Sequence, residues 1–80
     1  MRLTVYGRSH CHLCEEMLSA LRPFQERYGF ALEVVDIDGE PQLEARYGAK
    51  VPVLVTADRE LCHYFLDETM LIRHLEAGDP

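Results

Sequence analysis

The fold of this chain is decided by residues 3–14, which read Leu-Thr-Val-Tyr-Gly-Arg-Ser-His-Cys-His-Leu-Cys. The first four residues alternate polar and apolar side chains, as a half-buried strand does, and Gly7 begins a turn. Cys11 and Cys14 follow the turn, where a helical pattern starts. A C-x-x-C pair in that position can exchange electrons as a dithiol/disulfide couple, or it can bind a soft metal ion.

The rest of the chain predicts alternating helices and strands. Apolar residues recur at helical spacing after the cysteines, runs of β-branched residues predict strands, and Asp67 is the expected N-cap of a last helix. After the first strand, helices are predicted at about 12–28, 41–48 and from 67 onward. Strands are predicted at about 31–37, 51–55 and 61–65. This β-α-β-α-β-β-α order indicates a parallel β-α-β unit followed by an antiparallel hairpin. We expect residues 1–80 to form one domain.

Composition excludes several classes of protein. Asp and Glu total 14 against 8 for Lys and Arg, a net charge of −6, which argues against nucleic acid or an anionic membrane as a partner. No stretch approaches the roughly 20 apolar residues of a membrane helix, and no apolar leader follows the start. We therefore expect a monomer in the cytoplasm. Three cysteines cannot form a disulfide framework, and Cys62 is expected to be a buried small side chain.

The two paired cysteines have different expected roles. A thiol at a helix N-terminus faces unpaired backbone N–H groups, which favour the thiolate that attacks disulfides. This position belongs to Cys11, the predicted nucleophile, and Cys14 one turn later is the predicted resolving cysteine. Arg8 lies three residues upstream of Cys11, a position from which it is expected to contact an anionic substrate group. His12 between the cysteines is expected to stabilise the reduced form.

Three pieces of the sequence resemble the thioredoxin-like superfamily, and within it the short bacterial glutaredoxin-like family. They are residues 6–14, the Val51-Pro52 dipeptide, and residues 65–68, Phe-Leu-Asp-Glu. The resemblance implies an α/β thioredoxin-like fold with a four-stranded mixed sheet flanked by helices. It implies that the Val51–Pro52 peptide bond is cis and faces the C-x-x-C. It also implies that Val51 and Pro52 bind substrate, with the Val51 backbone pairing with a substrate peptide. It also implies that Asp67 caps the last helix and can hold the amino group of glutathione.

Two departures from the glutaredoxin pattern concern glutathione. Glutaredoxins carry Gly-Gly before the last acidic pair, whereas the bulkier Tyr64-Phe65-Leu66 stands here. Glu15 and Glu16 follow the second cysteine and would repel an anionic ligand. The sequence therefore predicts a site poorly shaped for glutathione, which remains a candidate co-substrate and the only candidate cofactor.

The predicted function is that of a thiol–disulfide oxidoreductase. Its substrate would be a disulfide in a protein or a small molecule, and its reductant a system such as glutathione or a thioredoxin-type reductase. The alternative is a module that binds copper, zinc or an iron–sulfur cluster through the same cysteines. Heavy-metal-associated domains also place C-x-x-C between a first strand and helix, but they favour Met where Ser9 stands. Pro41, which opens a helix, and Val51-Pro52 favour the redox interpretation, and no metal ligand set is assigned.

Overall fold

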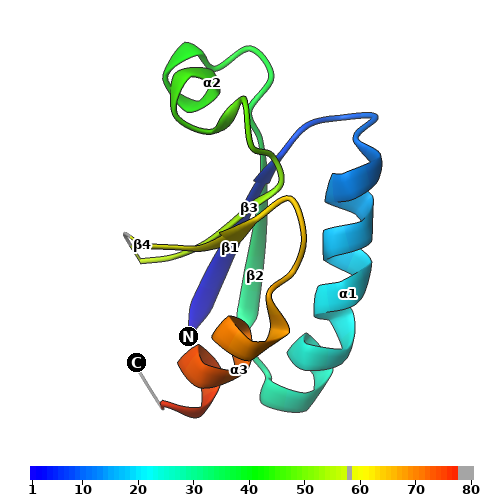
Figure 1. Ribbon diagram of the computed structural model, residues 1–80, viewed down its shortest axis with the longest axis vertical. Helices are drawn as coiled ribbons and strands as arrows, with labels where there is room; N and C mark the ends of the chain where they lie inside the picture. Colours follow the sequence, from blue (N-terminus) through cyan, green and yellow to red (C-terminus); the bar gives the residue numbers. More distant parts are fainter. Residues whose placement is uncertain (58, 78–80) are drawn as a thin grey trace.

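A computed structural model describes residues 1–57 and 59–77 of the chain. The elements are, in order, β1 (Arg2–Gly7), α1 (His12–Tyr28), β2 (Ala31–Asp36), α2 (Pro41–Tyr47), β3 (Val53–Thr56), β4 (Arg59–His63) and α3 (Glu68–Glu76). Figure 1 shows α1 running alongside the sheet and α2 at the end toward which β1 points. The predicted β-α-β-α-β-β-α order and the thioredoxin-like α/β fold are confirmed.

The sheet has four strands in the order β2-β1-β3-β4. β1 is parallel to β2, antiparallel to β3, and β3 is antiparallel to β4. Because β1 and β2 are parallel, their carboxyl ends meet at one edge of the sheet. The β1–α1 and β2–α2 connections therefore leave from the same edge, at the top of Figure 1. The C-x-x-C lies on the first of these connections.

The hairpin between β3 and β4 is tighter than predicted. The fourth strand was expected at 61–65, but β4 spans Arg59–His63 and its first residue pairs with Thr56. Ala57 adopts a positive φ of 49°, as short hairpin loops require. Part of the connection between the two expected strands, which spans residues 56–60, lies outside the described residues. As a result Tyr64 leaves the sheet, and its backbone N–H donates to the carbonyl oxygen of Pro52 at 2.9 Å.

The core consists of two apolar clusters. The larger joins β1, α1, α3 and the β3–β4 hairpin, and its buried residues are Leu3, Val5, Met17, Leu21, Phe30, Leu54, Leu61, Leu71 and Leu75. The smaller joins α2 to β1 and β3 through Ile37, Tyr47, Val53 and Val55. The sheet thus has α1 and α3 packed in one cluster and α2 in the other.

The two longer helices have well-formed ends. α1 stops at Gly29, which adopts a left-handed conformation (φ 73°) and donates its N–H to the carbonyl of Gln25 at 2.8 Å. α3 begins at Asp67, whose carboxylate accepts the Met70 N–H at 3.0 Å. The predicted N-cap of the last helix is therefore confirmed. Within α3, the His74 ring lies 3.1 Å from the Thr56 hydroxyl and ties the helix to β3.

Removing this cap should destabilise the domain. We expect Asp67→Ala to lower the free energy of unfolding by about 1 kcal/mol, because the Met70 N–H loses its acceptor. Asp67→Asn keeps a side-chain oxygen in place and should retain most of that stability. Urea denaturation followed by circular dichroism measures both variants, and equal destabilisation by the two would contradict the capping role.

Candidate active site

Cys11 and Cys14 are joined by a disulfide, with their Cα atoms 5.2 Å apart. Cys11 is the N-cap of α1, a helix of 17 residues, and its sulfur accepts the backbone N–H of Cys14 at 3.2 Å. A sulfur in this position faces the positive end of the helix dipole and backbone donors that have no helical partner. The geometry therefore favours a thiolate on Cys11 once the disulfide is reduced.

The two sulfurs differ in how far solvent can reach them. Cys11 is half-buried, whereas Cys14 is only 5% exposed. The wall behind Cys14 is the backbone of Gly7, where an added Cβ atom would lie 3.0 Å from the Cys14 sulfur. Any larger residue would require the Cys14 sulfur to shift. An incoming substrate disulfide meets Cys11 first, and Cys14 is left as the inner partner.

The first turn of α1 carries two glutamates, and one of them pairs with His12. The His12 ring nitrogen Nε2 lies 2.7 Å from a carboxylate oxygen of Glu16, and both side chains are largely exposed. Glu15 is exposed beside them. A protonated His12 would therefore be partly neutralised by Glu16, and its predicted effect on the reduced form stays a prediction.

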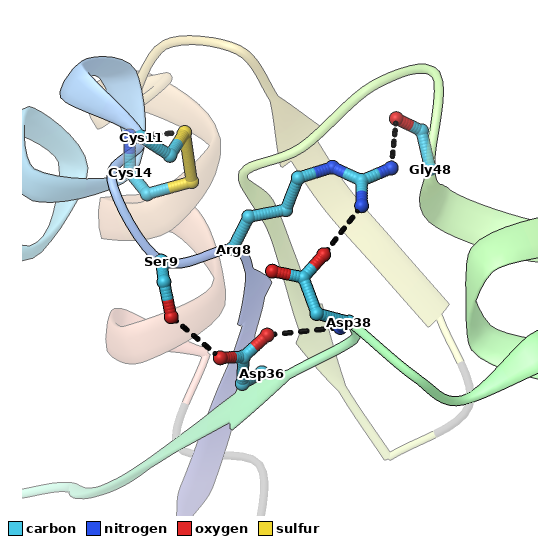
Figure 2. Close-up of a disulfide and its surroundings, with 7 residues drawn as sticks. All are labelled: Arg8, Ser9, Cys11, Cys14, Asp36, Asp38 and Gly48. Carbon is cyan, nitrogen blue, oxygen red and sulfur yellow. Dashed lines mark hydrogen bonds and ion pairs between the residues drawn. A yellow bond between two sulfur atoms is a disulfide. The ribbon is translucent and has the colours of Figure 1, made fainter.

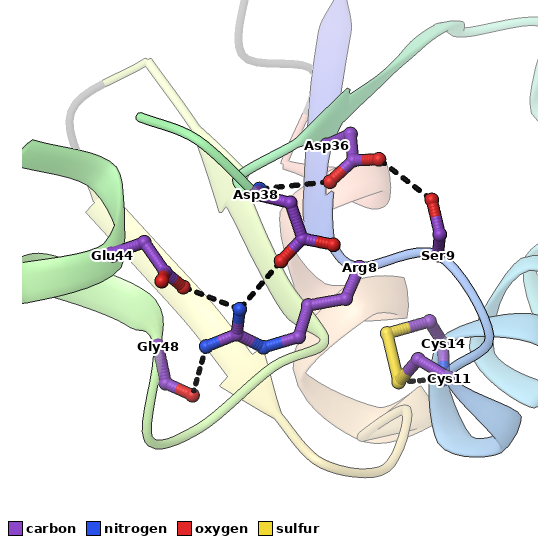
Figure 3. A network of polar contacts seen from close by, with 8 residues as sticks. All are labelled: Arg8, Ser9, Cys11, Cys14, Asp36, Asp38, Glu44 and Gly48. Carbon is purple, nitrogen blue, oxygen red and sulfur yellow. Dashed lines mark hydrogen bonds and ion pairs between the residues drawn. A yellow bond between two sulfur atoms is a disulfide. The ribbon is translucent and has the colours of Figure 1, made fainter. Parts of the chain in front are cut away.

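Arg8 has three partners inside the protein. Its Nη1 donates to Asp38 Oδ1 at 2.7 Å and also forms an ion pair with Glu44, while Nη2 donates to the Gly48 carbonyl oxygen at 3.1 Å. Figures 2 and 3 show the side chain extending away from the disulfide toward Gly48. The hydrogen bonds to Asp38 and Glu44 raise the pKa of Arg8 above its ordinary value. The predicted contact with an anionic substrate group stays a prediction.

A second set of hydrogen bonds links the same loops. The Ser9 hydroxyl donates to one carboxylate oxygen of Asp36, and the Asp38 backbone N–H donates to the other, each at 2.9 Å (Figure 2). These two donors, the Asp38 N–H foremost, hold the pKa of Asp36 below its ordinary value. The loop that carries the cysteines is thus bonded to the β2–α2 connection at two successive residues.

The peptide bond between Val51 and Pro52 is cis, as predicted. Pro52 is fully buried, and in both close-ups the loop from Gly48 to β3 turns beside the disulfide (Figures 2 and 3). Tyr64 holds this loop from the other side, since its hydroxyl donates to the Ala49 carbonyl at 2.8 Å in addition to its backbone bond to Pro52.

Two residues beside the site have an unusual backbone conformation. His10, directly before Cys11, has a φ of 57°, and Tyr64 has a φ of 65°. Non-glycine residues seldom adopt positive φ, and those that do concentrate at functional sites. Sequence reasoning missed both because neither is glycine or asparagine, the residues that usually signal this conformation.

Comparison with known proteins shows the family to which the chain belongs. A family model described as "Glutaredoxin-like domain (DUF836)" matches residues 2–76. The chain belongs to this glutaredoxin-like family. Protein Ne2328 from Nitrosomonas europaea, solved by NMR, is 49% identical, with 91% of this chain and 88% of that one covered and a TM-score of 0.84. Protein XcR50 from X. campestris is 40% identical over 98% of this chain and 99% of that one, with a TM-score of 0.75.

A more distant structure shares the fold. The glutaredoxin-like protein NrdH-redoxin from Escherichia coli, described as having a thioredoxin-like activity profile, is 24% identical over the whole of this chain and 97% of its own, with a TM-score of 0.61. At this identity the match supports the thioredoxin-like fold alone. The glutaredoxin-like domain studied here thus has a disulfide-bonded C-x-x-C in the setting of a redox motif.

The third cysteine of this glutaredoxin-like domain lies away from the pair. Cys62 is half-buried at the margin of the larger core cluster, so it is less buried than predicted, and its sulfur accepts the Asp67 backbone N–H at 3.5 Å. Burial raises the pKa of the Cys62 thiol. The contact also links β4 to the start of α3, so the thiol has a packing role.

The described residues supply no cluster of metal ligands at the cysteine pair. Within residues 1–57 and 59–77, no three His, Cys, Asp or Glu side chains lie close enough together to hold a metal ion.

Among the same residues, no helix has the length and apolar character needed to cross a bilayer.

The three thiols of the reduced protein should react at different rates. At pH 7 we expect iodoacetamide to modify Cys11 at least about tenfold faster than Cys62, because thiolate reacts and burial disfavours the Cys62 thiolate. Since the pKa of Cys62 is raised, its rate should keep climbing as the pH rises above the ordinary thiol range. Mass spectrometry of peptides from timed reactions measures this order, and faster labelling of Cys62 would contradict it.

Proposed function

We propose that this glutaredoxin-like domain is a thiol–disulfide oxidoreductase in which Cys11 is the nucleophile and Cys14 the resolving cysteine. The observation that carries the proposal is the position of the Cys11 sulfur. It caps the N-terminus of a long helix, it belongs to a residue that is less buried than Cys14, and it is already bonded to the Cys14 sulfur. A sulfur so placed combines thiolate character, access to substrate and a partner for resolution.

The reaction is an exchange of one disulfide for another. The Cys11 thiolate attacks one sulfur of the substrate disulfide, whose S–S bond breaks and releases the first substrate thiolate. Cys14 then loses its proton and attacks the Cys11 sulfur of the mixed disulfide, which releases the second substrate thiolate. Both substrate thiolates take up protons. The substrate has gained two electrons, and the domain has become the Cys11–Cys14 disulfide seen in the structure.

A thiol reductant must return those two electrons. Glutathione or a thioredoxin-type reductase would do so, and we infer that the domain works as a monomer in the cytoplasm, where such reductants keep thiols reduced.

The loop at Val51–Pro52 is an argument that the substrate is a peptide or another extended chain. Its cis peptide places Pro52 in the core while Val51 stays half-buried. Across residues 1–57 and 59–77, the backbone groups of Val51 have no backbone hydrogen bond. They are therefore open to an extended segment next to the attacked disulfide. His12 and Asp67, at the starts of α1 and α3, are the remaining proposed substrate contacts.

Substitution of single cysteines tests the assigned roles. Cys11→Ser should abolish reduction of an insulin disulfide, because no nucleophile remains. Cys14→Ser should still attack but accumulate a mixed disulfide on Cys11, visible as added mass in non-reducing mass spectrometry. Cys62→Ser, the matched control, should keep turnover. Full turnover of a protein substrate by Cys14→Ser would show that the roles are wrongly assigned.

A further inference from the structure

Arg8 joins the cysteine loop to the connection before α2 at Asp38, to α2 itself at Glu44, and to the end of α2 at Gly48. We infer that Arg8 is a positioning residue: together with Asp38, Glu44 and Gly48, here called the Arg8 bridge, it holds the segment leading to the cis Val51–Pro52 peptide in place against the C-x-x-C. The kinetic part of this inference rests on the proposed oxidoreductase function, whereas its structural part does not.

The connectivity of the bridge supports this role. Arg8 lies three residues before Cys11, and Gly48 lies three residues before Val51. One guanidinium thus spans the two loops, with Nη2 on the Gly48 carbonyl at 3.1 Å and Nη1 on the carboxylates of Asp38 and Glu44 (Figure 3). The planar fork of arginine can meet partners in two directions at once, which the single ammonium of lysine cannot do.

The helix that the bridge holds is short and depends on its contacts with the rest of the fold. α2 has seven residues, and its N-cap Glu40 makes no side-chain capping bond. A helix this short is not stable by itself in water and depends on tertiary contacts. Tyr47 and Leu43 supply apolar contacts on one side of α2. Arg8 supplies the polar contacts, to Glu44 within α2 and to Gly48 at its end.

The charges in the bridge argue against a free anion-binding arginine. The one positive charge of Arg8 faces two carboxylates, those of Asp38 and Glu44, and its side chain is 31% exposed. These two carboxylates occupy the Nη1 end of the guanidinium, and their negative charges would repel an anionic substrate from its remaining N–H groups. Arg8 therefore serves the site through the loops that it joins.

The two roles for Arg8 make opposite predictions for its partners. If Arg8 bound substrate, Glu44→Gln would free its charge and lower the KM for an anionic substrate. If Arg8 is a positioning residue, Glu44→Gln and Asp38→Asn weaken the bridge and raise the KM. The first measurement is therefore the KM of each variant for a peptide–glutathione mixed disulfide, with Arg22→Met as a control that removes an exposed arginine of α1.

We expect Arg8→Met to raise this KM about tenfold with kcat changed less than about twofold, because substrate meets a less ordered loop while Cys11 is unaltered. Arg8→Lys should recover only part of the loss. The equilibrium constant of the Cys11–Cys14 couple with glutathione should shift less than about twofold. A lower KM in Glu44→Gln, or full recovery in Arg8→Lys, would overturn the positioning role.

A second measurement does not depend on activity. The backbone N–H groups of Gly48 and Lys50 are hydrogen-bonded to Glu44 and Tyr47, each at 2.9 Å. Their hydrogen exchange reports opening of the segment after α2. Arg8→Met should speed their exchange about tenfold while Arg22→Met leaves it unchanged. Unchanged hydrogen exchange in Arg8→Met would overturn the inference. If Arg8→Met shows faster hydrogen exchange but the wild type catalyses no thiol–disulfide exchange, only the proposed function is refuted.

Discussion

The contact between the Cys11 sulfur and the first turn of α1 is the interaction on which the rest of this site depends. It requires a strand that ends at Gly7, a short loop, and a helix that begins immediately after the cysteine. The same helix start places Cys14 one turn inward, against the backbone of Gly7, where an added Cβ atom would press on the Cys14 sulfur. Backbone geometry is therefore the basis on which we expect the two thiols to differ in reactivity.

Much of the fold could be predicted from the periodicity of apolar residues and from a few residues that form turns or end helices. Helical spacing and strand-like runs placed the elements correctly, because each has an apolar face that matches its own repeat. β4 was misplaced by two residues, since the short hairpin after Thr56 carries no glycine or asparagine to mark it. The cis bond at Val51–Pro52 was implied only by family resemblance, because sequence alone does not distinguish the two isomers.

The site was predicted in part, and the reason lies in sequence separation. Cys11 and Cys14 are neighbours in sequence, so their chemistry was readable from the motif. The partners of Arg8 lie 30 to 40 residues away and meet it only because β1 and β2 run parallel. That meeting gives the basic residue before the cysteines three internal partners. It also brings the carboxylates of Asp38 and Glu44 onto the Arg8 guanidinium.

The most direct test of the account is a redox titration of the Cys11–Cys14 couple against glutathione buffers, followed by mass spectrometry of trapped thiols. We expect one reversible two-electron transition confined to this pair, between about −270 and −120 mV, the range of known C-x-x-C oxidoreductases. Cys62 should remain a free thiol throughout. The absence of a reversible transition in that range, or a stable glutathione adduct in place of the Cys11–Cys14 disulfide, would contradict it.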